Sequence, residues 1–226
     1  IANPVETLTN NIRSCEVVLE AMEAASTKAP LLIASTSETY MTRANEKFTP
    51  SSESDLISFP SGVCLQQTYA LSKFVNEVTG LSYVKKSGLN IAIARIFNTI
   101  GPNQLSAYGM VVPNFVKSAL AQKTLVIFGD GSQTRTFCDV RDTVVALNSL
   151  LDNRQCYGGI FNVGSDREMS ILDLAKLIIK VTASKSAISF MSYKEAYGVD
   201  YTDVLRRCPD LTKLKKATGF SPKYGL

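Results

Sequence analysis

The chain has 226 residues, of which 45% are hydrophobic and 19% are charged, values typical of a globular protein with a sizeable core. Its net charge of +4 is mild, and no dense basic run alternates with aromatic residues, which argues against nucleic-acid binding. No hydrophobic stretch approaches the roughly 20 residues that a membrane-spanning helix needs, and residues 1–25 lack the pattern of a secretory signal.

The five cysteines are odd in number and widely scattered, at positions 15, 64, 138, 156 and 208. This distribution fits a reducing, cytoplasmic setting better than a disulfide framework. Because the chain has no histidine and no closely spaced pair of cysteines, a metal site is not expected.

The first half of the chain alternates helical and strand patterns. Residues 5–25 carry hydrophobic side chains at three- and four-residue steps and predict an amphipathic helix, with Pro4 in its first turn. The next predicted elements are, in order, a strand at 31–35, a polar loop at 41–66, a helix at 68–84 and a strand at 90–96. This order predicts an open parallel α/β sheet, in which ligands bind beyond the carboxyl ends of the strands.

The second half predicts a smaller α/β unit built from shorter elements. They are, in order, a helix at 112–121, a strand at 125–128, a tight turn at 129–131, a helix at 139–151, a strand at 159–163, a helix from Ser170 to 181, a strand at 187–191, a loop at 193–204 and a helix at 211–218 that ends at Gly219. Residues 1–100 are expected to complete a parallel sheet, and residues 101–226 to form a smaller lobe that interleaves with it.

Tyr69 and Lys73 lie four residues apart in the predicted helix, so their side chains share one face. A cation one helical turn from a phenol favours the phenolate, and we therefore expect Lys73 to lower the pKa of Tyr69 from about 10 towards neutrality. Such a tyrosine can act as a general base on a substrate hydroxyl, with Thr36 sharing the hydrogen bond. The alternative for this spacing alone is a surface tyrosine beside a solvated lysine.

The order of the surrounding segments resembles the extended short-chain dehydrogenase/reductase family. STSE at 35–38 follows the first strand, YALSK at 69–73 lies in the next helix, and ARIFNTIGP at 94–102 ends the second strand. Within that family the sequence is similar to NAD-dependent nucleotide-sugar epimerases, dehydratases and decarboxylases, over nearly the whole chain. The resemblance implies the C-terminal part of a Rossmann-type doubly wound parallel sheet plus a smaller α/β substrate-binding lobe.

The glycine-rich dinucleotide loop of that family is missing from these residues. Neither Gly-x-Gly-x-x-Gly nor Gly-x-x-Gly-x-x-Gly occurs in the sequence, and in the family this loop precedes the point where the chain begins. The sequence is therefore expected to be a fragment, with 1–100 the remainder of the NAD-binding domain and 101–226 the nucleotide-sugar lobe. A fragment that binds sugar nucleotides without catalysis is one of the functional alternatives.

The resemblance also implies which residues carry the chemistry. Tyr69 would deprotonate the sugar 4-hydroxyl, Thr36 would share its hydrogen bond, and Lys73 would also bind the nicotinamide ribose while C4 passes a hydride to NAD. Glu38 would lie beside them as a fourth catalytic residue. The other residues expected beside NAD are Asn11, Ser35 and Phe97, although Asn11 could equally be a polar helix residue with no ligand.

Further residues are implied for the substrate, a nucleoside-diphosphate sugar that is expected to be UDP-linked. Arg135 would bind the diphosphate, because a guanidinium fork matches phosphate oxygens, and either Arg206 or Arg207 would act similarly. The remaining expected contacts are Asn98 on the diphosphate and Val112 and Phe128 along the base. A solvent-facing ion pair is the alternative for each arginine, and a core position is the alternative for Phe128. Arg95, in an apolar strand, is interpreted as structural, since a buried charge is costly unless paired.

Glu38 bears on the type of reaction. Dehydratases of the family usually carry an Asp-Glu pair where this chain has Ser37-Glu38, and plain 4-epimerases often have no carboxylate there. A Ser-Glu pair is typical of UDP-glucuronate decarboxylases and of epimerase-like relatives. The first interpretation is a UDP-sugar 4-epimerase, an isomerase that works through a 4-keto intermediate, and the second is UDP-glucuronate decarboxylase, a lyase. A homodimer built from the helices at 5–25 and 68–84 is also expected by resemblance.

Overall fold

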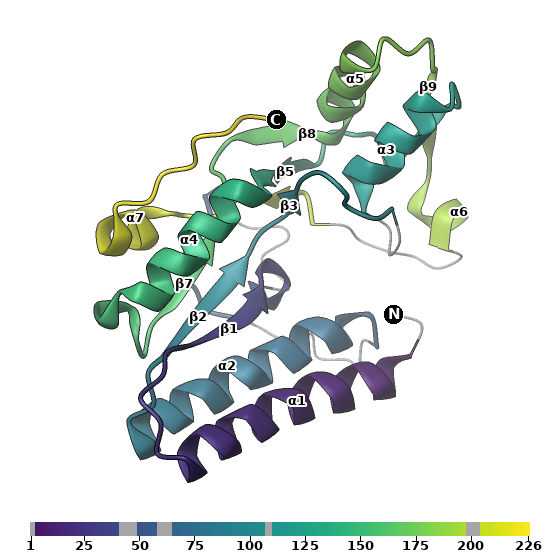
Figure 1. The fold of residues 1–226 in the computed structure, drawn as a ribbon. Helices are drawn as coiled ribbons and strands as arrows, with labels where there is room; N and C mark the ends of the chain where they lie inside the picture. Colours follow the sequence, from purple (N-terminus) through teal and green to yellow (C-terminus); the bar gives the residue numbers. More distant parts are fainter. Residues whose placement is uncertain (1–2, 41–48, 58–64, 107–109, 198–203) are drawn as a thin grey trace.

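The computed structural model describes residues 3–40, 49–57, 65–106, 110–197 and 204–226. The chain forms a main parallel sheet with helices on both faces and a smaller lobe beyond the carboxyl ends of its strands (Figure 1). The α/β class and the parallel sheet predicted from the sequence are confirmed.

The main sheet contains β1 (Leu31–Thr36), β2 (Ile91–Ile96) and β7 (Ile160–Val163), in the order β1-β2-β7. All are parallel, and the register places Thr36 beside Ile96 at the carboxyl end. The two halves of the chain interleave, because β7 comes from beyond residue 100 and still completes this sheet.

Alternate residues of β2 face opposite helical layers, as the two-residue period of a strand requires. Ile91 and Ile93 pack in one buried cluster towards α1 (Pro4–Ala24) and α2 (Thr68–Ser87). Ala92 and Ala94 belong to a second cluster on the other face, where α4 (Val140–Asp152) and α7 (Thr212–Thr218) cover the sheet (Figure 1). Every residue of this strand from 91 to 95 is buried, which explains its continuous apolar run.

Close packing fixes the position of α2 against β1. Gly80 faces Ile33, and a Cβ atom added at this glycine would overlap the isoleucine side chain. The helix ends at Gly88, which takes a left-handed conformation with φ of 63° and donates its N–H to the carbonyl of Val84. The first helix, α1, is capped at its N-terminus by Asn3, whose side chain accepts a hydrogen bond from the backbone N–H of Glu6.

The smaller lobe has its own core between α3 (Val111–Leu120), α5 (Ile171–Val181) and a two-stranded parallel ribbon. The ribbon pairs β4 (Leu125–Phe128) with β9 (Ile188–Met191). Beside it, β5 (Thr134–Thr136) lies between β8 (Glu168–Ser170) and β10 (Arg206–Arg207), and β3 (Thr99–Ile100) pairs with β6 (Cys138–Asp139).

The structure differs from the sequence prediction at short elements. The predicted loop at 193–204 begins with a helix, α6 (Tyr193–Tyr197), and 3-10 turns occur at η1 (Ser37–Tyr40), η3 (Leu65–Gln67) and η5 (Arg154–Cys156). Of the predicted loop at 41–66, residues 41–48 and 58–64 lie outside the described residues, and Ser51 forms a β-bridge with Pro209. The two- and three-residue strands β3, β5, β6, β8 and β10 were not predicted.

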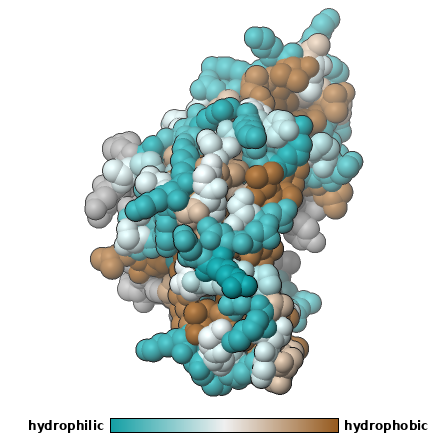
Figure 2. Space-filling model, turned by 60° about the vertical axis from the view of Figure 1, so that its left-hand side comes forward, coloured by the Kyte–Doolittle hydropathy of each residue, from teal (hydrophilic) through white to brown (hydrophobic). Residues whose placement is uncertain are grey.

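Within the described ranges, none of the helices is long and apolar enough to cross a membrane. Four cysteines are free thiols, at 15, 138, 156 and 208, and Cys64 lies outside the described residues. The described segments contain no group of three or more cysteine, aspartate or glutamate side chains placed to hold a metal ion. On the face drawn in Figure 2, hydrophilic residues are interrupted by separate hydrophobic patches.

Candidate active site

The carboxyl edge of the main sheet brings together the residues that the sequence analysis singled out. Thr36 ends β1, and Asn98 follows β2 by two residues, so both lie at the same edge. Helix α2 begins at Thr68 and places Tyr69 beside this edge, near enough to Thr36 for that side chain to lower the pKa of the phenol. The structure therefore brings Thr36 and Tyr69 into one site.

Tyr69 is a neutral phenol in this arrangement. Burial raises its pKa above the ordinary value of 10.0, the negative charge of Glu38 raises it further, and the hydrogen bond with Thr36 lowers it by less. The prediction that Lys73 lowers the pKa of Tyr69 is wrong for this structure. The Lys73 ammonium lies 5.9 Å from the centre of the Tyr69 ring and donates instead to the carbonyl of Ala34, at 3.1 Å.

Glu38 lies in η1, the single 3-10 turn that follows β1. Its three companions in the turn, Ser37, Thr39 and Tyr40, are buried, with exposures of 4%, 0% and 5%, whereas Glu38 is exposed. The backbone N–H of Glu38 donates to Oγ1 of Thr36 at 3.3 Å. The carboxylate is close enough to Tyr69 to raise its pKa, so an acidic side chain and a phenol share one site.

The residues expected beside NAD occupy different environments. Asn11 borders a cavity with Lys73, and its side-chain amide donates to Oγ of Ser72 at 2.9 Å, which ties α1 to α2. Ser35 is 4% exposed and donates its hydroxyl to Glu77. Phe97 is 2% exposed, with its ring centre 6.2 Å from that of Tyr40. Asn11 is thus placed at a cavity, whereas the side chains of Ser35 and Phe97 are in the core.

The cavity between α1 and β1 has a volume of about 240 Å³ and a polar end that suits a ribose. Lys73 supplies donors there, and burial lowers the pKa of its ammonium group. Asn76, which also lines the cavity, has a buried Oδ1 with no hydrogen-bond partner among the described residues. A sugar diol donates and accepts hydrogen bonds, so this pair of groups fits the ribose portion of a dinucleotide.

A second cavity, of about 610 Å³ and called the larger cavity because it exceeds the one between α1 and β1, lies in the smaller lobe next to Asn98. Its walls combine apolar side chains with a few polar ones, the usual make-up of a small-molecule site. The residues that line it include Asn98, Val111, Phe128, Gln133, Arg135 and Tyr193. Val112, expected at the base, packs against the core of the lobe, and its neighbour Val111 lines the cavity instead.

Arg135 and Arg207 project to the same side of their small sheet. They are register partners in the parallel pair β5–β10, and register partners point to the same face. Arg206 therefore points to the opposite face, where it forms an ion pair with Glu168 and lines a separate cavity. Arg135 lines the larger cavity and donates to the carbonyls of Thr134 and Val204, at 2.8 and 2.7 Å.

Gln133 and Tyr193 are among the lining residues of the larger cavity that were not anticipated from the sequence. Gln133 donates to the carbonyl of Phe128 at 2.8 Å and to the hydroxyl of Tyr193 at 3.2 Å. The Tyr193 ring packs against Gly129, whose φ of 75° keeps it free of a side chain. Gln133 could have been found from the sequence, because it lies two residues before Arg135 in the run DGSQTR. Tyr193 gave no such signal, because it lies in a segment that was predicted as a loop.

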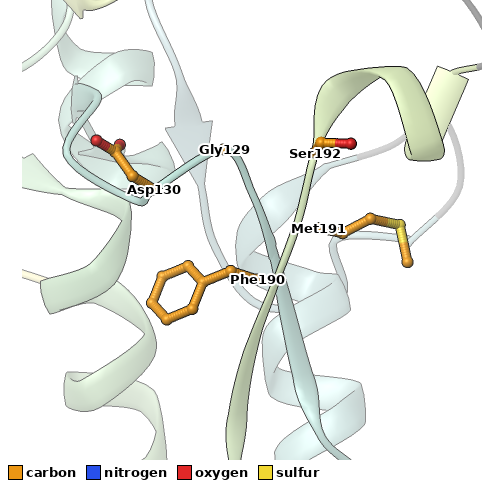
Figure 3. Close-up of a pocket in the computed structure, with 5 residues that line it drawn as sticks. All are labelled: Gly129, Asp130, Phe190, Met191 and Ser192. Atoms are coloured by element: carbon orange, nitrogen blue, oxygen red, sulfur yellow. The ribbon is translucent and has the colours of Figure 1, made fainter.

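The ribbon β4–β9 carries exposed aromatic residues on both of its faces. Phe190 and Met191 point to opposite sides, and a hollow of about 450 Å³ lies beside them at Gly129, Asp130 and Ser192 (Figure 3). Phe128 is 37% exposed and lines the larger cavity, so its ring is available to a ligand on that side.

Comparison with known proteins assigns the family. The profile of the NAD dependent epimerase/dehydratase family matches residues 1–164. The chain belongs to this NAD-dependent family. Among its curated relatives is UDP-N-acetyl-alpha-D-glucosaminuronate decarboxylase of Bacillus cytotoxicus, 33% identical over 219 residues, which are 96% of this chain and 66% of the relative. UDP-glucuronic acid decarboxylase 1 of Danio rerio is 35% identical over 97% of this chain and 49% of the relative.

Solved structures of this epimerase/dehydratase family share the fold. The UDP-glucose 4-epimerase of Thermotoga maritima, solved with UDP-glucose, has a TM-score of 0.86 and 25% identity, covering 100% of this chain and 68% of that one. The UDP-glucuronic acid 4-epimerase of Bacillus cereus, solved with UDP-glucuronic acid and NAD, has a TM-score of 0.80 and 27% identity, covering 96% and 64%. The chain spans about half to two thirds of the length of these curated relatives.

Proposed function

We propose that this protein uses NAD to oxidise a UDP-linked uronate at C4 and then decarboxylates it. The observation that carries the proposal is the identity of the curated relatives, which are named as decarboxylases of UDP-uronates and align over nearly the whole chain. The Ser37-Glu38 pair supports it, because Glu38 is the exposed carboxylate beside Tyr69. This reverses the order of the two reactions given by the sequence alone.

The first step needs a base at the 4-hydroxyl, and we assign it to Tyr69 with Thr36. NAD, when bound, would accept the hydride from C4 and later return it. Only the phenolate of Tyr69 can receive the proton of the hydroxyl, so the neutral phenol of this structure must first release its own proton to solvent; the hydrogen bond with Thr36 favours that phenolate. Lys73 is placed to hold ribose hydroxyls, with Asn11 and Asn76 on the same cavity wall.

Decarboxylation follows from the ketone at C4, because the C5 carboxylate is then β to a carbonyl. The C5–C6 bond breaks, C6 leaves as carbon dioxide, and the electron pair of that bond forms an enolate across C4 and C5. A proton must then reach C5, and we assign its delivery to Glu38, acting through a water or directly. The exposed position of Glu38 beside Tyr69 fits this role.

The nucleotide end is assigned to the larger cavity. Arg135 lines this cavity, and its register partner Arg207 projects to the same side of the small sheet, which supports Arg207 over Arg206 as the second arginine for a diphosphate. Asn98 lies between this cavity and Thr36, where a sugar diphosphate would pass. Phe128 offers its exposed ring to the base.

We further propose a cytoplasmic homodimer in which α1 and α2 form the interface. Both helices expose apolar side chains, at Val17 and Val18 on α1 and at Leu71 and Val78 on α2. Burying such positions against a second copy is favourable. In this scheme residues 1–100 serve mainly the cofactor and 101–226 mainly the nucleotide sugar.

A 4-epimerase remains the second candidate, and the solved structures favour it. The Thermotoga maritima and Bacillus cereus neighbours are both named as 4-epimerases, with TM-scores of 0.86 and 0.80. Epimerisation uses the same oxidation at C4 but returns the hydride to the other face of the ring. It needs no proton donor at C5, so Glu38 distinguishes the two reactions.

The test uses the protein expressed from its complete gene, supplied with NAD and separately with UDP-glucose, UDP-glucuronate and UDP-N-acetylglucosaminuronate. Products are identified by NMR and mass spectrometry. We expect carbon dioxide and a pentose nucleotide from a uronate, with a rate that falls about 10²-fold in Glu38→Gln and is unchanged in the exposed control Glu20→Gln. Epimerised product with a Glu38-independent rate would replace the proposal by the second candidate, and UDP binding without turnover would favour a binding function.

A further inference from the structure

A buried chain of side chains connects the helix that carries Tyr69 to the turn that carries Glu38. Glu77 lies on α2, two turns beyond Tyr69, and is 1% exposed. It accepts two hydrogen bonds from Arg95 of β2, from Nε at 2.9 Å and from Nη2 at 2.7 Å. The arginine is therefore held in a fixed orientation by the helix.

The guanidinium group of Arg95 also contacts η1, through the ring of Tyr40. Its guanidinium carbon lies 4.7 Å from the centre of the Tyr40 ring, a cation–π arrangement in which the flat side chain supports the ring. Arg95 is 2% exposed and Tyr40 is 5% exposed, so neither contact is screened by water. Tyr40 is the last residue of the turn that presents Glu38.

The hydroxyl of Tyr40 fixes the other end of the ring. It donates to Oδ1 of Asn162 on β7, at 2.7 Å. Asn162 is fully buried, and its Nδ2 donates to the carbonyls of Ser51 and Asp210, at 2.8 and 3.2 Å. Through Asn162 the Tyr40 hydroxyl is thus connected to β7 and to the chain segments at Ser51 and Asp210.

We propose that Tyr40 is a positioning residue, which sets the location of Glu38 relative to Tyr69 through its contacts with Arg95 and Asn162. The inference rests on the proposed function, because it concerns the carboxylate assigned to C5. The Glu38 side chain is exposed while the other three residues of its turn are buried, so the carboxylate takes its place from that turn. Motion of the turn would move the acid away from the phenol without altering the nucleotide cavity.

The test compares Tyr40→Phe and Tyr40→Leu with the matched control Tyr157→Phe. The Phe variant keeps the ring over Arg95 and loses only the hydroxyl, whereas the Leu variant loses both contacts. Tyr157 also donates its hydroxyl at 2.7 Å, to the carbonyl of Leu151, and it lies before β7 begins, at the opposite end of the parallel sheet from Glu38. Each is made in the protein expressed from its complete gene.

We expect kcat on UDP-glucuronate to fall on the order of tenfold in Tyr40→Phe and further in Tyr40→Leu, with KM within about twofold of the original. Hydrogen exchange of the peptide covering 36–40 should accelerate about fivefold in Tyr40→Phe, since one buried hydrogen bond is lost. The Tyr157→Phe protein should change neither quantity. The Phe variant carries the test if the Leu variant does not fold.

The proposal is overturned if Tyr40→Phe keeps the original kcat and the original exchange at 36–40, or if Tyr157→Phe reduces kcat equally. Hydrogen exchange needs no substrate, so it distinguishes a failure of the proposed function from a failure of the positioning role. If the unaltered protein converts no UDP-sugar but Tyr40→Phe still loosens 36–40 alone, the proposed function fails while the positioning role stands.

Discussion

Replacing Arg95 by methionine should destabilise the protein severely. The substitution leaves the Glu77 carboxylate buried at 1% exposure, with the Ser35 hydroxyl as its remaining side-chain hydrogen-bond partner among those described. Burial of the Arg95 guanidinium lowers its pKa, but the hydrogen bonds and charge of Glu77 together raise it by more, so the guanidinium stays charged. The variant must therefore bury a lone charge or bind a proton.

The magnitude follows from the burial of both partners. Breaking a buried ion pair by removing one partner costs about 3–5 kcal/mol, whereas replacing both by hydrophobic residues is often neutral. For a chain of this size, 1 kcal/mol corresponds to roughly 2–4 °C in Tm, so Arg95→Met should lower Tm by about 6–20 °C. The double variant Glu77→Met/Arg95→Met should recover most of that loss.

Thermal melts and urea titrations followed by circular dichroism measure the effect. The control is Lys176→Met, which breaks a 3.7 Å pair with Asp173 on an exposed helix face and should cost less than about 1 kcal/mol. If Arg95→Met costs no more than this control, or if the double variant is as unstable as the single one, the buried pair does not have the role assigned to it.

Three further outcomes are expected. Tyr69→Phe should lower kcat by about 10²-fold or more while UDP affinity, measured by calorimetry, stays within about twofold; near-full turnover would remove Tyr69 from the mechanism. Arg135→Ala and Arg207→Ala should each weaken UDP binding by about 1.5–3 kcal/mol, and Arg206→Ala should not, because its guanidinium faces the other side; equal losses in all three would contradict the register argument. Hydrogen bonds from Arg141 hold the pKa of Asp139 at about 2, so the stabilising effect of this carboxylate is complete above about pH 4 and is lost as the pH falls through 2. Replacing Asp139 by Asn should therefore flatten that part of a Tm-against-pH curve. An unchanged slope in Asp139→Asn would refute this assignment.

The long elements could be predicted because their periodicity is extensive enough to read. Helix α5, with four buried apolar positions on one face, was predicted to its last residue at Val181. Strand β10 is two arginines long, and two residues carry no period at all. Its pairing with β5 depends on residues far away in the sequence, so neither the strand nor the direction of Arg207 could be read locally.

The sequence predicted which elements carry the candidate site residues but not the contacts that the ends of their side chains make. The spacing of Tyr69 and Lys73 fixes their shared helix face, and the structure bears this out. It does not say that the ammonium group reaches past the phenol to Ala34, which depends on where β1 lies beneath the helix. The contact of Tyr40 with Asn162 joins positions 122 residues apart and left no local signal.

The hydrogen bond from Lys73 to the carbonyl of Ala34 also prepares the lysine for a ligand. Leu31 donates its backbone N–H to the carbonyl of Asn90, on the β2 side, so the backbone groups of Leu32 and Ala34 point away from β2. One of the three N–H donors of the Lys73 ammonium is used by Ala34, and two remain. Because this bond already restricts the long side chain, Lys73 would lose less conformational entropy when it binds the ribose hydroxyls proposed for it.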